Sequence, residues 1–345
     1  MNATLPLFAT QQTKQFHFEG NLPHQQRAVD SILAVLETVT FTKPNQQMAL
    51  VSNPLAPKDK QLALSAYAKS IEAVQKHNEI LGHIAKPESN VLDISMETGT
   101  GKTYTYTKMM FELNARLKLF KFIVVVPTLP IKAGTVNFLK SQASQEHFET
   151  NYQNKSIRCH IVESQSSKKS KKDLMPQSIL DFVQAPNDGQ TIHVLVINAG
   201  MINSDTLSKK YDRAVFDQFN TPFDAIASIA PMVIIDEPHR FSTAQKTWGN
   251  IQKLGGQFIV RYGATFNEDY SNLIYQLTAV DAFNQDLVKG VVAYIEEFEG
   301  AKDTSIKLVE IDTSNKKKEE VIFQVKREKD KKKVHLLKNE SLSKV

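Results

Sequence analysis

The chain has 345 residues, of which 41% are hydrophobic and 23% charged, and it carries a formal net charge of +5. This composition is ordinary for a globular protein of one large or two smaller domains. The excess positive charge lies in residues 302–345, so the net charge gives little indication of whether the rest of the chain binds nucleic acid. The single Cys159 excludes an internal disulfide framework, no apolar run reaches the roughly 20 residues of a membrane span, and no secretory signal opens the chain, so we expect a cytoplasmic protein without membrane partners.

A helix is predicted after Phe18, with its first turn at Pro23 and apolar residues recurring at helical spacing toward Val39. Gln25 stands in that first turn, and its side-chain amide could offer both a donor and an acceptor to the edge of an adenine. Taken alone, Gln25 is an ordinary residue at a helix start. It gains meaning only from the loop that follows.

Residues 53–88 are interpreted as an insertion that contains one helix. Turn signals stand at Asn53-Pro54 and Ala56-Pro57, and apolar residues at helical spacing then run from Asp59 to Ile84. This helix either packs into the core or covers the nucleotide side of the sheet, and the sequence leaves both possibilities open.

The stretch Val91–Tyr106 carries the strongest chemical signal. An apolar run of strand length leads into a turn rich in glycine and threonine, and residues that can begin a helix follow. Glycines let successive backbone N–H groups point at phosphate oxygens, helped by the positive end of the helix. Lys102 would reach the β- and γ-phosphates of ATP, and the Thr103 hydroxyl would ligate Mg²⁺. The expected ATP-binding residues are Gln25, Thr98, Gly99, Thr100, Gly101, Lys102, Thr103 and Tyr104.

The strict phosphate-loop pattern has a glycine where this chain has Met96, a departure that is typical of helicase-like motors. The alternative interpretation is a strand-to-helix turn that binds no ligand. Lysine and threonine directly after Gly-Thr-Gly, behind an apolar run, favour the phosphate loop.

Further buried strands are predicted at 122–126, 157–162, 192–197, 230–236 and 257–262. Helical segments separate them, which predicts a three-layer α/β fold around a mainly parallel sheet. Ligands gather at the carboxyl ends of such strands. The residues there that could contact a DNA backbone are Pro127, Thr128, Lys132 and Asn198. The basic stretch 164–172 is either a solvated loop or a surface that faces DNA.

Asp236 and Glu237 end one of these apolar runs. A carboxylate at this position can hold Mg²⁺ opposite Thr103, and Glu237 could orient and deprotonate the water that attacks the γ-phosphate. An Asp-Glu pair after apolar residues is a weak signal by itself, and the upstream phosphate loop makes it a strong one. We therefore predict Glu237, Asp236 and Lys102 as catalytic residues.

A coupling role is predicted for His239 and for the turn Gly263-Ala264-Thr265 that follows the strand at 257–262. A hydrogen bond between them would connect the nucleotide state to the neighbouring strand end. The alternative is that His239 merely starts a helix.

The chain changes character near its C-terminus. Residues 305–311 and 320–325 are predicted as paired strands, joined by the charged loop 313–318. The basic run Lys326–Lys333 is a solvated strand edge, an unfinished linker or a phosphate-contacting surface. We expect a main domain at 1–295, and at 296–345 a basic, β-hairpin-like extension or the start of a linker.

These motifs occur in an order that resembles a known family. The segments PHQQRA, METGTGKTYTY, VVPT, DEPH and GATF look like the first motor domain of superfamily-two helicases. METGTGKTYTY, DEPH in place of DEAH, and NLIYQLTAVDAFNQDLVKGV at 272–291 narrow the resemblance to the restriction (Res) subunit of type III restriction–modification enzymes. The resemblance covers roughly residues 20–295.

The resemblance implies a RecA-like P-loop NTPase whose ATP hydrolysis, with Mg²⁺, drives communication along double-stranded DNA before cleavage. It implies a second partner, the modification (Mod) subunit, which reads the recognition sequence. The roles it assigns are adenine contact by Gln25, phosphate and Mg²⁺ contact by Gly99–Thr103, metal and water contact by Asp236 and Glu237, DNA contact by Pro127, Thr128 and Asn198, and coupling by His239 and Thr265.

A complete Res subunit also has a second RecA-like domain, which supplies an arginine finger, and a nuclease domain. Neither is found after Gly300, and Glu310-Ile311-Asp312 lacks the lysine of a nuclease centre, so we expect a fragment or the product of a split gene. Such a chain would hydrolyse ATP poorly and would not cleave DNA alone. The alternatives are another superfamily-two motor, such as a type I restriction subunit or a repair helicase, and a non-catalytic remnant.

Overall fold

The computed structural model describes residues 18–57, 60–163, 175–266 and 270–288, together with strand segments at 304–312, 320–327 and 330–337. Met1–Lys289 and Gly290–Val345 form two compact units, which are described separately below. The basic stretch 164–172 lies outside the described residues.

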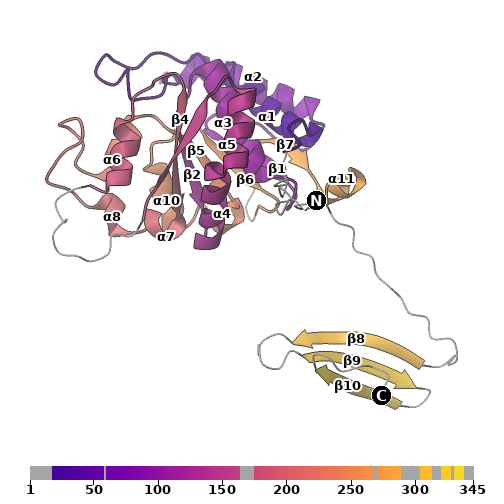
Figure 1. Cartoon of the computed structure of the whole chain (residues 1–345). Coiled ribbons are helices and arrows are strands. Elements are labelled where there is room, and N and C mark those ends of the chain that lie inside the picture. Colours follow the sequence, from indigo (N-terminus) through magenta and orange to yellow (C-terminus); the bar gives the residue numbers. More distant parts are fainter. Residues whose placement is uncertain are drawn as a thin grey trace, which may run out of the picture. The chain divides into compact units, whose positions relative to one another are not determined.

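Seven of the described strands form a parallel sheet in the first unit (Figure 1). Their spatial order is β3-β4-β2-β5-β6-β1-β7. The six strands that the sequence predicted are confirmed, and the edge strand β7 was not predicted. The bounds are β1 (Val91–Met96), β2 (Lys121–Val126), β3 (Ser156–Ile161), β4 (Thr191–Asn198), β5 (Met232–Asp236), β6 (Ile259–Gly263) and β7 (Leu273–Leu277).

Both faces of the central strands are covered. In β2, Phe122 and Val124 belong to one hydrophobic core, whereas Ile123 and Val125 belong to the other. Since successive side chains of a strand point to opposite faces, one continuous apolar run fills two cores at once. The unit is therefore the three-layer, RecA-like α/β fold that the sequence predicted.

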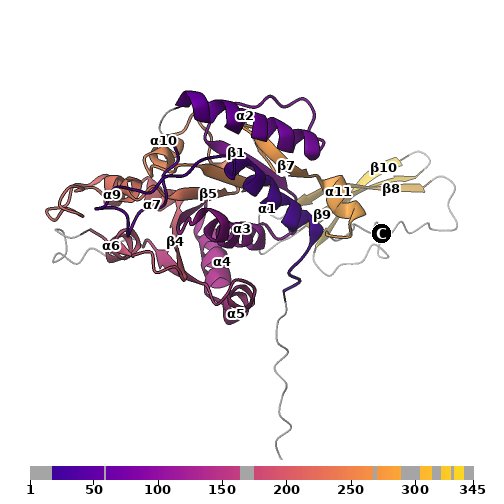
Figure 2. The ribbon, with the colours of Figure 1, turned by 90° about the horizontal axis from the view of Figure 1, so that it is seen from above.

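The helices divide between these two cores. Helices α1 to α5 contribute to the first core, and α6 to α10 contribute to the second. Figure 2 shows α3, α4 and α5 side by side on their face of the sheet. The bounds are α1 (Pro23–Leu36), α2 (Lys60–His77), α3 (Lys102–Leu117), α4 (Leu129–Lys140), α5 (Gln142–Asn151), α6 (Gln177–Gln184), α7 (Ala199–Ile202), α8 (Asp205–Ser208), α9 (Pro222–Ser228), the 3₁₀ helix η1 (Pro238–Arg240), α10 (Lys246–Gln252) and α11 (Ala279–Asn284).

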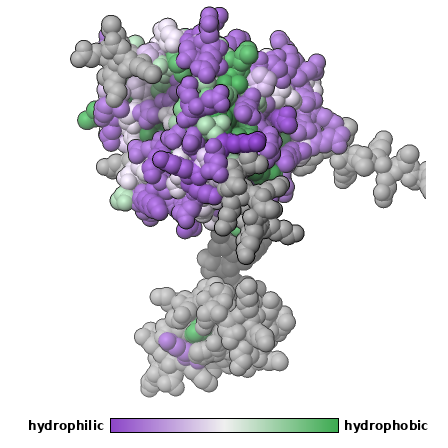
Figure 3. Space-filling model, turned by 90° about the vertical axis from the view of Figure 1, so that its left-hand side faces the viewer, coloured by the Kyte–Doolittle hydropathy of each residue, from purple (hydrophilic) through white to green (hydrophobic). Residues whose placement is uncertain are grey.

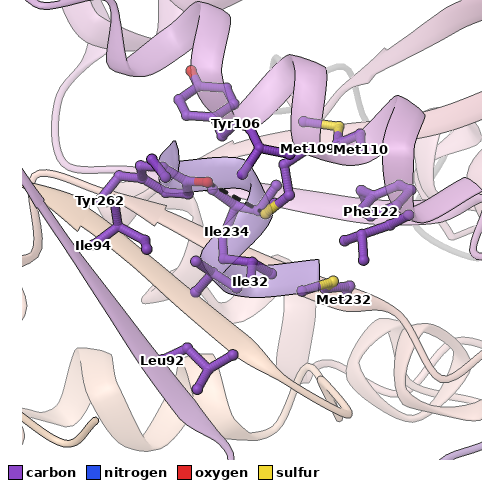
Figure 4. Packing of buried hydrophobic residues seen from close by; sticks show 14 of the residues in the cluster. Ile32, Leu92, Ile94, Tyr106, Met109, Met110, Phe122, Met232, Ile234 and Tyr262 are labelled. Atoms are coloured by element: carbon purple, nitrogen blue, oxygen red, sulfur yellow. Dashed lines mark hydrogen bonds between the residues drawn. The ribbon is translucent and has the colours of Figure 1, made fainter. Parts of the chain in front are cut away.

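Figure 4 shows part of the first core, where Tyr106, Met109 and Met110 of α3 lie close to residues of the sheet. Tyr106 and Tyr262 are fully buried with ring centroids 5.7 Å apart, and the Tyr262 hydroxyl donates to the Met109 sulfur at 3.3 Å. Edge-to-face aromatic pairs and sulfur contacts add directionality to apolar burial. They fix the first turns of α3 against β6, at the place where the phosphate loop was predicted.

Helix α2 was predicted over Asp59–Ile84, and it ends earlier, at His77. It packs against α1 and β7, and the side chain of Ile71 is fully buried. The Gln75 amide donates to the Leu273 carbonyl at 2.9 Å, and Asn78, just past the helix end, donates to the Ile274 carbonyl at 2.6 Å. Of the two interpretations, these contacts favour packing into the core.

Asn53 was interpreted as a turn signal, and it also ties together the amino ends of two strands. Its side chain is fully buried, and its amide donates to the carbonyls of Lys121 and Ala230 at 2.9 and 3.0 Å. Its oxygen accepts from the backbone N–H groups of Phe120 and Lys121. A buried amide with four hydrogen bonds specifies one register for the chain around it.

Lys121 is buried at the amino end of β2, where its ammonium donates to the carbonyls of Phe182 and Ala185. Burial lowers the pKa of Lys121 to about 7. Between this value and the ordinary lysine pKa, the unfolded chain holds a proton that the folded chain does not. The free energy of unfolding therefore rises with pH in this interval, by at most about 1.4 kcal/mol per pH unit from this group.

Replacing Lys121 with methionine should remove this dependence. We expect the difference in unfolding free energy between wild type and Lys121→Met to shift in favour of wild type from pH 7.5 to pH 9, as measured by urea unfolding. The nearby imidazoles of His160 and His193 have pKa values lowered by burial to about 4 and about 3, so they do not titrate in this range. Parallel pH profiles for the two proteins would contradict the prediction.

The described strands of the second unit form an antiparallel sheet in the order β10-β9-β8. The strands are β8 (Thr304–Asp312), β9 (Glu320–Arg327) and β10 (Asp330–Leu337). The predicted pair of strands is confirmed. The third strand was not predicted. The basic run Lys326–Lys333 includes both the end of β9 and the beginning of β10, and its charged residues do not show the apolar pattern that indicates a strand.

Hydrophilic side chains make up most of the face of the first unit seen in Figure 3, with smaller hydrophobic patches between them. No helix among the described residues is both long enough and apolar enough to cross a membrane. The large hydrophobic residues that are exposed in the described part are Leu50, Leu81, Ile84, Leu129, Val280 and Phe283.

Candidate nucleotide-binding site

The loop between β1 and α3 has the backbone that a phosphate loop needs. Gly99 and Gly101 adopt φ values of 86° and 88°, in the left-handed region that favours glycine. A Cβ on Gly101 would lie 2.4 Å from the Gln25 amide nitrogen, so this position admits no side chain without a rearrangement. Inside the loop, the Thr100 hydroxyl donates to the Glu97 carbonyl at 2.7 Å. Gly101 is the N-cap of the 16-residue helix α3, whose first turn begins at Lys102.

The two predicted carboxylates lie beside this loop. In the sheet, β5 is separated from β1 by β6 alone, so the carboxyl ends of β1 and β5 open onto the same region. The Lys102 ammonium lies 3.4 Å from a Glu237 carboxylate oxygen. Both Asp236 and Glu237 line the same cavity as Lys102 and Thr103. The fold therefore brings together the phosphate loop and the Asp236-Glu237 pair, which lie far apart in the sequence.

Glu237 adopts a left-handed backbone conformation with φ 58° and ψ 62°. A non-glycine residue in this region carries a cost of roughly 1–2 kcal/mol, which surrounding contacts must offset. The Glu237 N–H donates to the Tyr262 carbonyl at 3.0 Å, and this bond holds the turn. After this turn the chain enters η1 directly, and the Glu237 carboxylate contacts the Lys102 ammonium.

Asp236 is the group best suited to a metal ion. Its side chain is buried, and no group among the described residues hydrogen-bonds its Oδ1 atom. Burial raises the pKa of Asp236 to about 6, the adjacent Glu237 carboxylate adds to the rise, and Lys102 opposes it. A divalent cation would favour the charged form and would satisfy Oδ1. Thr103 lines the same cavity and could supply a hydroxyl ligand, so the residues present fit Mg²⁺.

Gln25 and its neighbour His24 hold the phosphate loop from the other side. Both side chains contact the Thr100 carbonyl: the Gln25 amide donates at 3.1 Å, and His24 Nε2 lies at 2.9 Å. The Gln25 Oε1 atom is buried and accepts no hydrogen bond from any described residue. Gln25 therefore keeps an acceptor for a ligand while its donor braces the loop. The role of His24 was not predicted.

The cavity enclosed by these groups has a volume of about 490 Å³. Among the residues whose side chains the structure describes, none from α2 lines it, whereas residues of the segment 18–22 and of α4 do. Five lining residues were missed by the sequence analysis, since no periodicity or motif marks them: Phe18, Glu19, Leu22, Ile131 and Phe138. Thr98 and Gly99 are exposed in the loop, and Thr100 is buried within it.

The predicted coupling turn, Gly263-Ala264-Thr265, lies against Pro238, the residue that follows the Asp236-Glu237 pair. A Cβ on Gly263 would lie 2.6 Å from Pro238 Cδ, so Gly263 permits the close packing of η1 on the end of β6. His239 Nδ1 lies 3.3 Å from the second Glu237 oxygen. Ala264 and Thr265 follow directly at the carboxyl end of β6. The coupling roles of His239, Gly263, Ala264 and Thr265 stay predictions.

The predicted DNA contacts lie further along the same edge of the sheet. Asn198 pairs with Val126 across β4 and β2, so Pro127 and Thr128 begin beside it. Lys132 and Asn198 line a second cavity, of about 680 Å³, together with Leu129. The Lys132 ammonium donates to the Val162 carbonyl, so part of its hydrogen-bonding capacity is already used.

A parallel sheet with a glycine-rich loop at the start of a helix, and a carboxylate pair at a nearby strand end, defines the class of RecA-like P-loop NTPase folds. The family described as "Type III restriction enzyme, res subunit" matches residues 21–268. The chain belongs to this family, as the sequence resemblance predicted.

The relatives agree with this assignment. The chain is 52% identical over 287 residues to the type III restriction-modification enzyme EcoP15I Res subunit of Escherichia coli, and 51% identical over 286 residues to the EcoPI Res subunit of Escherichia phage P1. Each match covers 81% of this chain, and the chain spans about 29% of the length of these relatives.

A more distant likeness is to a solved structure of a nuclease-deletion mutant of the Type ISP restriction-modification enzyme LlaGI in complex with a DNA substrate mimic. Its sequence identity is 18% and its TM-score 0.38, over 64% of this chain and 20% of that chain.

Proposed function

We propose that this chain is the ATP-binding and ATP-hydrolysing motor part of a type III Res subunit, and that hydrolysis is coupled to movement along double-stranded DNA. The observation that carries the proposal is the 3.4 Å contact between Lys102 and Glu237 beside the buried Asp236. A lysine, a buried carboxylate and a partly exposed carboxylate around one cavity belong to the set of groups that phosphoryl transfer to water uses.

In this proposal the loop from Thr98 to Thr103 cradles the phosphates through its backbone N–H groups, and Lys102 neutralises their charge. Thr103 and Asp236 would hold Mg²⁺, which would supply positive charge to stabilise the charge that develops on the phosphates. Glu237 would accept the proton of the attacking water, because its carboxylate lies at the cavity and its backbone turn fixes its direction.

Gln25 would recognise the base. Its amide nitrogen already donates to Thr100, and its buried oxygen, which has no hydrogen-bond partner among the described residues, would accept from the exocyclic amine of adenine. A guanine presents a carbonyl at the same position, which an oxygen cannot bind. Gln25 would therefore favour ATP over GTP.

DNA contact is proposed for the carboxyl edge of β2 and β4, where Pro127, Thr128, Lys132 and Asn198 lie. Small polar side chains and the N-terminal turn of α4 suit a phosphate backbone. As the sequence resemblance implies, the whole enzyme would also include a Mod subunit, a second motor domain and a nuclease. Strand cleavage would belong to that assembly, in the cytoplasm of the cell.

The test is phosphate release by this chain at saturating MgATP, with and without a long DNA duplex. We expect slow hydrolysis that the duplex accelerates, with no cleavage of the duplex. Hydrolysis that DNA leaves unchanged would contradict the coupling to DNA, and the absence of both ATP binding and hydrolysis would contradict the motor function itself.

A further inference from the structure

Residues 18–22 form one wall of the nucleotide cavity without belonging to any helix or strand. Phe18, Glu19 and Leu22 line the cavity, and the chain then enters α1, which carries Gln25. A segment of this kind has no ladder of backbone hydrogen bonds to hold it, so its position depends on side chains from elsewhere.

Two side chains of α3 converge on a single carbonyl of this wall. The Tyr104 hydroxyl donates to the Gly20 carbonyl at 3.2 Å, and the Lys108 ammonium donates to the same oxygen at 3.1 Å. Tyr104 and Lys108 are four residues apart and share one face of the helix. Tyr104 also comes directly after Lys102 and Thr103, so the wall is attached to the first turn of the helix that follows the phosphate loop.

His147 of α5 completes the arrangement. Its Nε2 lies 2.9 Å from the Tyr104 hydroxyl, and the imidazole tautomer decides which of these two atoms donates the hydrogen bond. The ring also lies against the wall itself: a Cβ on Gly20 would be 3.1 Å from His147 Cε1. The Phe18 ring packs against Tyr104, His147 and Phe138, with centroids 5.4 to 5.9 Å apart.

We propose that Tyr104, Lys108 and His147 form a latch that positions residues 18–22 against the nucleotide, and that this latch sets the affinity for ATP. The inference rests on the proposed function, and it makes Tyr104 a positioning residue whose hydroxyl acts through Gly20. The latch fixes the separation between the phosphate loop and the wall on the Gln25 side of the cavity. A nucleotide that spans both parts of the site then binds without first having to order the wall.

The decisive variant is Tyr104→Phe, which keeps the ring and removes the hydroxyl. We expect its dissociation constant for a fluorescent ATP analogue, with Mg²⁺, to rise about five- to tenfold, the effect of losing the one hydrogen bond that this hydroxyl gives to the wall. The matched control is Tyr152→Phe. The Tyr152 hydroxyl donates to Glu112 of α3 at 2.8 Å and its ring stacks on Phe111, but it does not contact the wall. This control should bind the analogue as wild type does.

His147 provides a rescue test. His147→Gln retains a side-chain amide that can donate to or accept from the Tyr104 hydroxyl and should bind close to wild type, whereas His147→Leu should resemble Tyr104→Phe. Hydrogen exchange of residues 18–25, measured without nucleotide, should be faster in Tyr104→Phe than in wild type and in Tyr152→Phe.

The outcomes separate this inference from the proposed function. If wild type binds the ATP analogue and Tyr104→Phe binds it equally, or if Tyr152→Phe is weakened as much, the latch is wrong and the nucleotide site stands. Unchanged exchange of residues 18–25 in Tyr104→Phe overturns the latch whether or not nucleotide binds. If wild type binds no nucleotide, the proposed function and the role of the latch fail together.

Discussion

Glu237→Gln is expected to lower the rate of DNA-stimulated ATP hydrolysis by roughly 10²- to 10⁴-fold while leaving ATP binding close to wild type. The amide is nearly isosteric with the carboxylate, so it preserves the shape of the cavity, but it cannot accept the proton of the attacking water. Lys102→Ala is expected to lower the rate by at least about 100-fold and to weaken ATP binding as well. Phosphate release at saturating ATP and titration with a fluorescent analogue distinguish the two effects.

The 3.4 Å contact between Lys102 and Glu237 makes this comparison informative, because each variant removes one side of the same ion pair. If the pair were only structural, the two variants would share a phenotype of lowered stability with little difference between binding and turnover. Glu72→Gln is the matched control, since Glu72 is exposed on α2, outside the cavity. Equal hydrolysis rates for wild type, Lys102→Ala and Glu237→Gln would eliminate the catalytic roles of both residues.

The second large effect concerns stability. Arg261 of β6 binds Asp93 of β1 through two hydrogen bonds, of 2.6 and 2.9 Å, and the Ser271 N–H donates to Asp93 at 2.6 Å. The side chains of Arg261 and Asp93 are 5% and 0% exposed. Asp93→Ala would leave a buried guanidinium without its partner, and we expect a loss of about 3–5 kcal/mol in the free energy of unfolding. Urea unfolding followed by circular dichroism measures this loss.

The chain offers a matched ion pair for comparison. Arg116 and Glu37 lie 2.9 Å apart, and their side chains are 47% and 43% exposed. Glu37→Ala should cost less than about 1 kcal/mol, since solvent screens this pair. The double variant Asp93→Ala/Arg261→Met should be less destabilised than the two single variants together, because it buries no unpaired charge. Equal losses for the buried and the exposed pair would contradict this account.

The parts of the fold that could be predicted from sequence are those in which the burial of the residues produces a recognisable apolar pattern in the local sequence. The apolar residues of β2 fill two cores, so their run in the sequence is continuous. Strand β7 lies at the sheet edge, where the exposed Gln276 interrupts its apolar run after three residues. Strand β10 begins with charged residues, and its strand conformation comes from pairing with β9.

The residues of the candidate site also divide into those that could be predicted from the sequence and those that could not. Lys102, Asp236 and Glu237 could be predicted, because the chemistry of phosphates and Mg²⁺ restricts the residues and their order along the chain. Phe18 could not, because its place at the cavity depends on contacts with α3, α4 and α5 that no local pattern encodes. The brace from His24 to Thr100 was missed for the same reason.

The hydrogen bonds of Asn53 have a mechanical consequence for the sheet. They join Lys121 and Ala230, at the amino ends of β2 and β5, while the opposite ends carry Thr128 and Asp236. Together with the pairing of Phe122–Val125 with Met232–Ile235, these bonds hold β5 in one register on β2. The same register places Asp236 and Thr128 at one edge of the sheet, so the position of the acidic motif relative to the start of α4 depends in part on a side chain at the far end of both strands.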